Sequence, residues 1–217
     1  MDSSPLAKLS AELRNEIYEL ALSFEDTITV TGTSASSDLE CSIGHPTALI
    51  QTCRQIRSEA TRMFYANNTF HIGGSGSSDS VEVTDAFSVL QRFSHTIGLH
   101  NSKAIKRISV EVVYHQRMHF PLEPSAMENI NAQIKSMRHA AQFLDTKSFK
   151  CVLKLYSLFQ HRFRPAVVVE LDVVDYEDSR QKAIAKNRED SLDLGDAIFA
   201  RLFLGMLHKD FGEEHGE

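Results

Sequence analysis

The sequence has few of the features that are typical of secreted and membrane-spanning proteins, such as paired cysteines, a secretory signal or a long apolar run. Its three cysteines, Cys41, Cys53 and Cys151, are far apart and odd in number, so we expect no disulfide framework. Scattered cysteines of this kind are typical of reduced thiols in an intracellular compartment, and we expect a cytoplasmic or nuclear protein. Because the N-terminal residues are polar and charged, we expect no secretory signal. No run approaches the roughly 20 apolar residues that a membrane helix needs, and we expect no membrane partner.

A surplus of positive charge is also missing. The formal net charge is −6 and the pI is about 5.9, whereas a domain that binds nucleic acid through its phosphates normally has a basic surplus. The local basic clusters, such as Arg54, Arg57 and Arg62, have acidic residues close by and are typical of a solvated face of mixed charge. We therefore expect no nucleic-acid partner.

The signatures of common enzymes are absent from the sequence. There is no Walker loop, dinucleotide fingerprint or nucleophile elbow. Gly73, Gly74 and Gly76 lack the Lys-Ser/Thr pair that follows a phosphate-binding loop, so we interpret residues 73–80 as a flexible linker. Acidic pairs such as Glu170 and Asp172 follow strand alternation and have no base or nucleophile near them in sequence.

Ten histidines make zinc the metal to consider. His115 and His119 are four residues apart, but they follow a predicted strand, where this spacing does not bring two imidazoles together. Cys41, Cys53 and His45 could supply three ligands, yet no close cysteine pair anchors them. We expect no metal, no cofactor and no catalytic residue.

What the sequence does contain is a series of amphipathic segments. Ser10 caps a predicted helix, and a second helix begins at Pro46 and ends at Asn67 and Asn68. Short strands follow each helix, at Thr27–Val30 and Thr69–Ile72, and residues 31–37 read as a loop. The apolar stripe expected to be buried is Leu13, Ile17, Leu20, Ala21 and Phe24 in the first helix, and Leu49, Cys53, Ile56, Ala60 and Met63 or Phe64 in the second.

Residues 81–211 continue with further helices and strands. We predict helices over 84–97 and 125–144, strands over 105–114 and 149–157, and a strand over 167–174 that is buried on both faces. Helices over 179–188 and 192–207 and a frayed tail, 212–217, complete the chain. Because strands alternate with helices, the predicted fold is mixed α+β, with a small, partly parallel sheet behind the N-terminal helices of residues 1–72, in one compact unit.

Two separated segments carry a resemblance. Leu9–Leu22 (LSAELRNEIYELAL) and Ala48–Ile72 (ALIQTCRQIRSEATRMFYANNTFHI) resemble, in order and at plausible spacing, a large group of fungal proteins described as F-box-like or as bearing a double Glu-x-Arg domain. The first Glu-x-Arg is Glu12-Leu13-Arg14, whereas the second is Gln55-Ile56-Arg57. Ser10 also replaces the proline that this group usually has before the first motif.

The resemblance implies a non-catalytic protein-interaction module. An F-box docks on the adaptor Skp1 through its helices while the rest of the chain holds a substrate for ubiquitylation. The residues that would bind the partner here are Leu6, Leu9, Leu13, Arg14, Ile17 and Tyr18. Apolar stripes at helical spacing are also what ordinary core packing produces, and Arg14 and Arg57 could each hold a carboxylate or carbonyl between the two helices. The alternatives that stay open are a small enzyme whose His, Asp and Glu side chains converge only in the fold, and a degenerate family member without activity.

Overall fold

The computed structural model describes residues 5–32, 39–41, 49–50, 54–74, 86–116, 124–144, 146–157, 167–175, 178–179 and 181–182. The elements are a 3₁₀ turn Pro5–Lys8, helices α1 (Ala11–Leu22), α3 (Arg54–Asn67), α4 (Ala86–Ile97), α5 (Leu99–Ser102) and α6 (Pro124–Leu144), and strands β1 (Ile28–Gly32), β2 (Leu39–Cys41), β3 (Thr69–Gly74), β4 (Arg107–Gln116), β5 (Ser148–Ser157) and β6 (Val167–Asp172).

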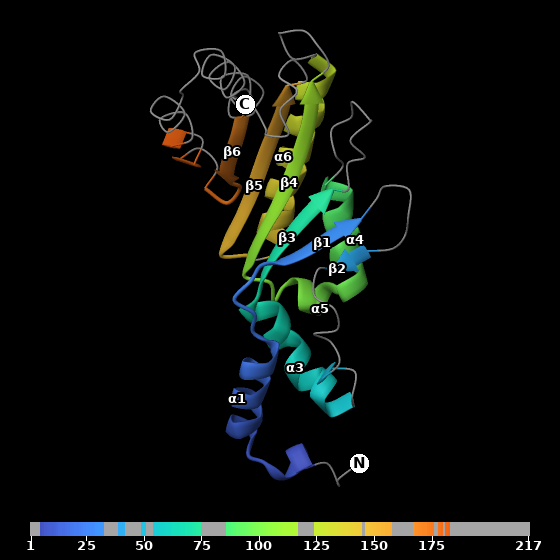
Figure 1. Ribbon diagram of the computed structural model, residues 1–217, viewed down its shortest axis with the longest axis vertical. Helices are drawn as coiled ribbons and strands as arrows, with labels where there is room; N and C mark the ends of the chain where they lie inside the picture. The colour runs from blue at the N-terminus through green and yellow to red at the C-terminus, as the bar shows by residue number, and fades with distance from the viewer. Residues whose placement is uncertain are drawn as a thin grey trace, which may run out of the picture.

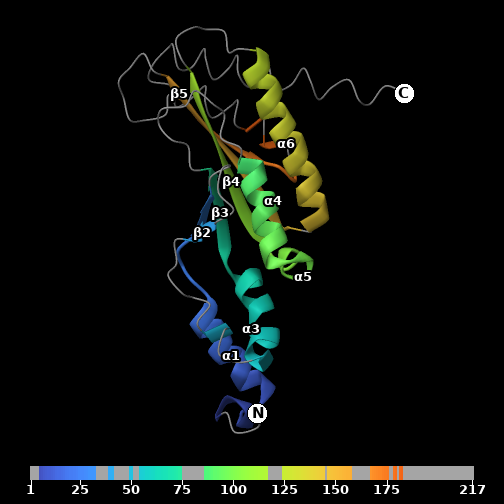
Figure 2. The ribbon, with the colours of Figure 1, turned by 90° about the vertical axis from the view of Figure 1, so that its right-hand side faces the viewer.

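The strands form one six-stranded sheet in the order β2-β1-β3-β4-β5-β6. The four central strands are parallel, and β2 and β6 pair antiparallel at the two edges. A helix lies in the sequence between each parallel strand and the next, and successive crossovers of one hand place their helices on one face of a sheet. Accordingly α4 and α6 cover the same face (Figure 2). The predicted mixed α+β fold with a partly parallel sheet is confirmed.

The core lies between this face and the helices. Alternate residues of the central strands are buried against it, such as Ile108 and Val110 in β4 and Phe149 in β5. Ile130 and Ile134 of α6 are fully buried on the opposite side of the same layer. Between these positions the strands carry side chains on the other face, among them the polar Ser109 in β4 and Lys150 in β5.

The prediction that residues 167–174 are buried on both faces is wrong. Val169 and Leu171 are buried, but Val168 and Val174 are 46% and 57% exposed. The cause is position, because this strand lies at the sheet edge and one of its faces is not covered by the described helices. The run of β-branched residues therefore forms a strand that is buried on one face and exposed on the other.

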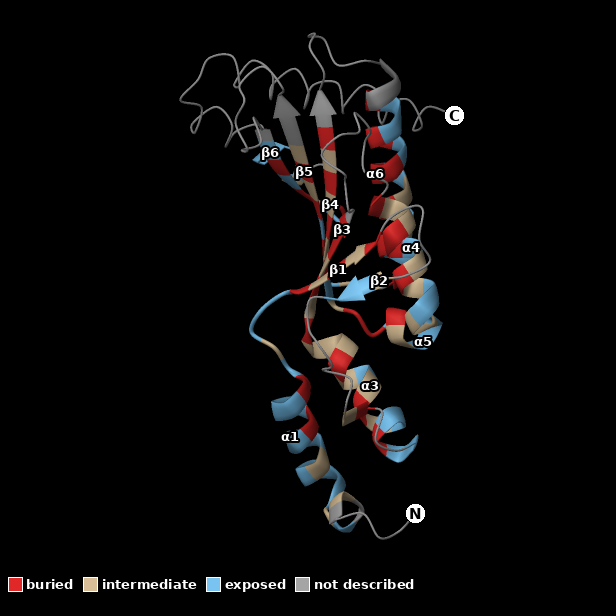
Figure 3. Cartoon of the chain, turned by 45° about the vertical axis from the view of Figure 1, so that its right-hand side comes forward, coloured by how far each residue is buried: buried red, intermediate tan, exposed pale blue. Residues whose placement is uncertain are grey.

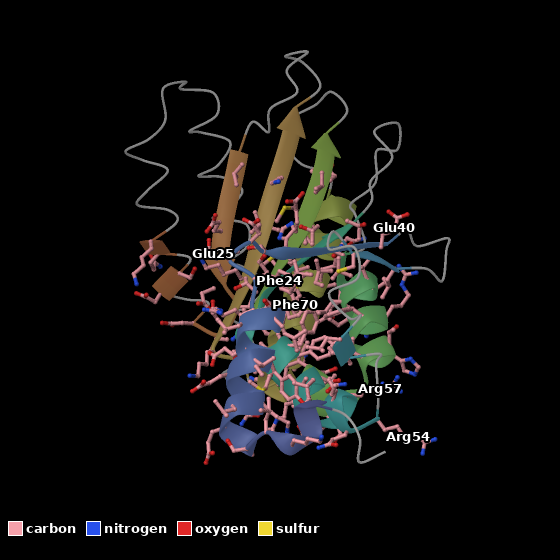
Figure 4. All side chains as sticks on the ribbon, turned by 60° about the horizontal axis from the view of Figure 1, so that its bottom comes forward. Phe24, Glu25, Glu40, Arg54, Arg57 and Phe70 are labelled. Atoms are coloured by element: carbon pink, nitrogen blue, oxygen red, sulfur yellow. The ribbon has the colours of Figure 1, made fainter. Side chains whose placement is uncertain are left out.

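Helices α1 and α3 lie together beyond one end of the sheet (Figure 1). Aromatic side chains join them to it: the rings of Phe24 and Phe64 meet edge to face at 6.5 Å, and those of Phe64 and Phe70 at 5.9 Å. Phe24 and Phe70 lie toward the middle of the molecule in Figure 4, while Arg54 and Arg57 reach its periphery. The hydrophobic core is thus continuous from β3 into the α3 helix.

The predicted elements that fall on described residues are recovered with shifted ends. Thr31 and Gly32 extend β1, and Gly73 and Gly74 extend β3, so these residues are strand rather than loop. The short edge strand β2 was not predicted. Residues 75–80, most of residues 179–207, the tail, and residues 46–48 and 51–53 of the second predicted helix lie outside the described residues.

Candidate functional site

The two helices that carry the Glu-x-Arg resemblance are held together by an ion pair. The Arg14 guanidinium donates to both carboxylate oxygens of Glu59 in α3, from Nε at 3.0 Å and from Nη2 at 3.2 Å. Its third donor, Nη1, reaches the Leu9 carbonyl at 2.8 Å. Arg14 therefore holds both a carboxylate and a carbonyl, as predicted, and the planar fork of arginine makes this possible.

Two further side chains donate hydrogen bonds to the Glu59 carboxylate. The Tyr18 hydroxyl donates to Oε2 and the Gln55 amide to Oε1, each at 3.0 Å. Hydrogen bonds from Gln55, then from Arg14 and Tyr18, lower the pKa of Glu59 below its ordinary value. Gln55 is the residue that replaces the glutamate of the second motif, and here it supplies a neutral donor to a carboxylate. A glutamate at that position would place two negative charges one helical turn apart.

Arg57 takes a different role from Arg14. It is exposed, and its Nε donates to the Ile50 carbonyl at 3.3 Å, within the segment that precedes α3 rather than across to α1. The prediction that both arginines join the two helices is therefore right for Arg14 and wrong for Arg57.

A buried asparagine fixes the other end of the α1–α3 pair. Asn68 is fully buried directly after α3. Its Nδ2 donates to the carbonyls of Leu22 at 2.6 Å and Phe64 at 2.7 Å, and its Oδ1 accepts the Phe24 backbone N–H at 2.8 Å. One side chain thus satisfies the last turns of two helices, which would otherwise leave carbonyls unpaired.

The face of α1 that packs on α3 is not the predicted one. Leu13 and Ile17 were expected to be buried in the helix–helix contact, but they are 49% and 37% exposed, and Leu20 is 85% exposed. The buried side chains are Tyr18 and Leu22, which follow Arg14 at four-residue spacing. Tyrosine and arginine bury an apolar body and keep a polar tip, so this second stripe looks polar in sequence although it packs as core.

Four of the six predicted partner-binding residues are therefore unavailable or only partly available. Arg14 and Tyr18 face α3, and Leu6 and Leu9 are half-buried. Leu13 and Ile17 remain accessible and are joined by Leu20, three residues on. We call these three exposed side chains of α1 the outer strip. Figure 3 shows that the buried part of α1 faces α3 and that the exposed part is turned away from it.

The polar face of the sheet holds a second cluster, which sequence reasoning missed. His71 Nδ1 lies 2.8 Å from Ser109 Oγ, and His71 Nε2 lies 3.4 Å from Glu111 Oε2. Lys154 Nζ approaches the same Glu111 oxygen at 2.6 Å. The hydrogen bond from His71, followed by Lys154, lowers the pKa of Glu111. The only signal in the sequence is the two-residue alternation of each strand, and the register between β3, β4 and β5 must be known before it can be used.

The order Ser109, His71, Glu111 is that of a nucleophile, its base and the carboxylate that orients the base. Its setting differs from that of a hydrolase. All three residues lie in strands whose backbone N–H groups point sideways to neighbouring strands, so these groups are not available to an oxyanion above the sheet face.

The metal and acid–base candidates stay apart or lie outside the described residues. Cys41 is exposed, Cys151 is buried with its thiol pKa raised to about 12 by burial, and Cys53 and His45 are not described. His119 and the side chain of His115 are also not described. Over the described part of the chain, no three His, Cys, Asp or Glu side chains are grouped as a metal would require. Glu170 pairs with Lys150 at 3.7 Å in an exposed position.

No family model matches the chain, and neither a curated protein nor a solved structure matches it. Among the described helices, none has both the length and the apolar character of a membrane span.

Proposed function

We propose that this chain is a non-catalytic protein-interaction module of the F-box-like type, and that the outer strip of α1 is its docking surface. The observation that carries the proposal is the exposure of Leu13, Ile17 and Leu20 on one side of a helix whose other side is already packed. Large apolar side chains gathered on a surface are costly in water, and a partner that covers them recovers that cost.

The helix is also held in a way that suits docking. Arg14 with Glu59, and Asn68 at the far end, fix α1 on α3 through contacts that do not involve the outer strip. A rigid surface loses less conformational entropy when it binds. Exposed carboxylates at Glu12, Glu16 and Glu19 beside the strip disfavour a nucleic-acid phosphate as the partner.

The resemblance of this segment to the F-box group makes the adaptor Skp1 the partner to test, with the chain acting as a substrate adaptor of a ubiquitin ligase. Calorimetric titration of the full chain with Skp1 should give saturable binding. The double variant Leu13→Ala/Leu20→Ala should weaken it about tenfold or more, since truncation of central apolar anchors commonly costs over 1.4 kcal/mol.

The matched control is Leu99→Ala, which also truncates a leucine that is more than half exposed but lies in α5. It should bind like the parent, and the thermal melts of all variants should coincide. If titration of the folded chain with Skp1 at tens of micromolar gives no heat, Skp1 is rejected as the partner. Equal weakening by the α1 and α5 variants rejects the outer strip as the docking surface.

The alternative of a small enzyme is tested at the Ser109–His71–Glu111 cluster, whose hydrogen-bond connectivity matches that of a hydrolase although its strand setting offers no backbone N–H to an oxyanion. The test is covalent labelling with a fluorophosphonate followed by peptide mass spectrometry. Modification of Ser109 that disappears in the His71→Ala variant would support the enzyme. An unlabelled Ser109 would leave the cluster as an ion-pair network on the sheet.

A further inference from the structure

A pocket opens between α4, α5 and α6, on the helix side of the sheet and separate from the outer strip. Its volume is about 960 Å³, and it is lined by side chains of all three helices. Figure 2 shows α4 and α6 running alongside each other with α5 at the end of α4. Pockets that bind small molecules commonly have volumes of about 300–1,000 Å³, mostly apolar walls and a few polar groups.

One wall of the pocket is held in place by hydrogen bonds at the corner between α4 and α5. Gly98 has a φ of +79°, a conformation that favours glycine, and its N–H donates to the Ser94 carbonyl at 3.1 Å. The hydroxyl of the buried Ser102 donates to the carbonyls of Ser94 and Gly98, each at 3.0 Å. These bonds hold α5 against the end of α4, so this side of the pocket is formed before any ligand arrives.

The interior of the pocket is apolar and its mouth carries large apolar side chains. Leu90 and Leu144 are buried and line it, together with the small side chain of Ala140. Leu99 and Phe143 line it from positions that are 55% and 58% exposed. Two such side chains at the edge of a cavity offer area that a ligand can remove from water.

The polar side chains that line the pocket belong to a glutamine, several serines and two histidines. None of the described residues that line it carries a carboxylate. His95 and His139 line it and are exposed, and each imidazole can donate a hydrogen bond. The Lys103 ammonium lies 5.5 Å from the centre of the Phe143 ring, which places a cation beside the mouth.

We propose that this pocket binds a small amphipathic acid, whose apolar part packs between α4 and α6 and whose anionic head lies at the rim formed by His95, His139 and Lys103. A neutral or cationic head of the same size loses the charge-assisted bonds at this rim. The inference is independent of the docking surface on α1.

The full chain is titrated with decanoate, decanol and decyltrimethylammonium, each below its aggregation limit, and followed by calorimetry and by amide chemical shifts. Decanoate should saturate the chain and bind about tenfold or more tightly than the other two. The shifts that move should belong to α4, α5 and α6. Absence of saturation, or equal affinity for all three heads, overturns the proposal.

Two sets of variants separate the apolar part from the head. Leu99→Ala/Phe143→Ala should weaken all probes about tenfold or more, and because both side chains are largely exposed, the fold should be retained. Lys103→Gln/His139→Gln should remove the preference for decanoate and leave the affinity for decanol unchanged. The control is Leu20→Ala in α1, and a loss of decanoate binding in this control would overturn the assignment of the site.

Discussion

The prediction that tests the N-terminal helix pair most directly concerns Asn68. Replacement by alanine removes three hydrogen bonds and leaves two carbonyls and one backbone N–H without their partner, in a place with no solvent exposure. Each unsatisfied buried group costs about 1–3 kcal/mol, and relaxation offsets part of the sum, so Asn68→Ala should lower the free energy of unfolding by about 3–5 kcal/mol.

Asn67→Ala is the matched control one residue earlier. The side chain of Asn67 is only half-buried and makes a single 3.5 Å contact with the Ser23 hydroxyl. Its removal should cost less than about 0.5 kcal/mol. Urea unfolding followed by far-UV circular dichroism measures both variants under the same conditions.

Asn68→Asp separates the donor from the acceptor at almost constant shape. The introduced carboxyl still accepts the Phe24 N–H, but its second oxygen would face the Leu22 and Phe64 carbonyls where an N–H₂ now donates. The folded-state pKa of that carboxyl should therefore be raised above its unfolded value, because the protonated form can donate to a carbonyl. Relative to the parent, the variant should lose stability at pH 7.5 and regain part of it as the pH falls below that raised value. Equal costs for Asn67→Ala and Asn68→Ala, or a loss in Asn68→Asp that does not change with pH, would refute the role of this residue.

Other contacts and the burial of single side chains give four more expected outcomes. Because the folded-state pKa of Glu59 is lowered, its stabilisation should be present above the unfolded value of about 4.3 and be lost as the pH falls through the folded value; the stability gap between the parent and Glu59→Gln should close in acid unfolding curves. Arg14→Lys should lower the melting temperature and Arg57→Lys should not, and a larger effect at Arg57 would contradict the geometry. Iodoacetamide at pH 8 should alkylate the exposed Cys41 and spare Cys151, whose thiol pKa is raised to about 12 by burial, until urea is added; peptide mass spectrometry reads both sites. Leu22→Ala should cost about 2–4 kcal/mol and Leu20→Ala less than about 0.5 kcal/mol in urea unfolding, since these leucines are 1% and 85% exposed.

The architecture could be predicted from the sequence because its signals are local. Helical periodicity and alternating strands require no knowledge of distant contacts, and their succession implies a parallel sheet. The stripe of α3 was also predicted correctly at Ile56, Ala60 and Phe64. In that helix the residues beside the stripe are arginines, glutamine and serine, so only one face can be core.

The faces of α1 and the polar cluster could not be predicted in this way. Two stripes compete in α1, and the choice between them depends on Glu59, which lies 45 residues from Arg14. The contact of His71 with Ser109 likewise depends on the register of two strands separated by 38 residues. Sequence spacing within one element carries no information about either.

The misassigned face of α1 has a physical consequence. If Leu13 and Ile17 had packed on α3, they would have been part of the core and would not be available to a partner. Instead the contact uses residues that bring their own hydrogen bonds: Tyr18 buries its ring and gives its hydroxyl to Glu59, and Arg14 gives its fork to the same carboxylate. Because directional bonds fix the rotation of α1 about its own axis, the aliphatic side chains are not needed for the fold and stay at the surface. An apolar strip that folding leaves uncovered while an ion pair holds its helix in place is the arrangement expected of a docking surface.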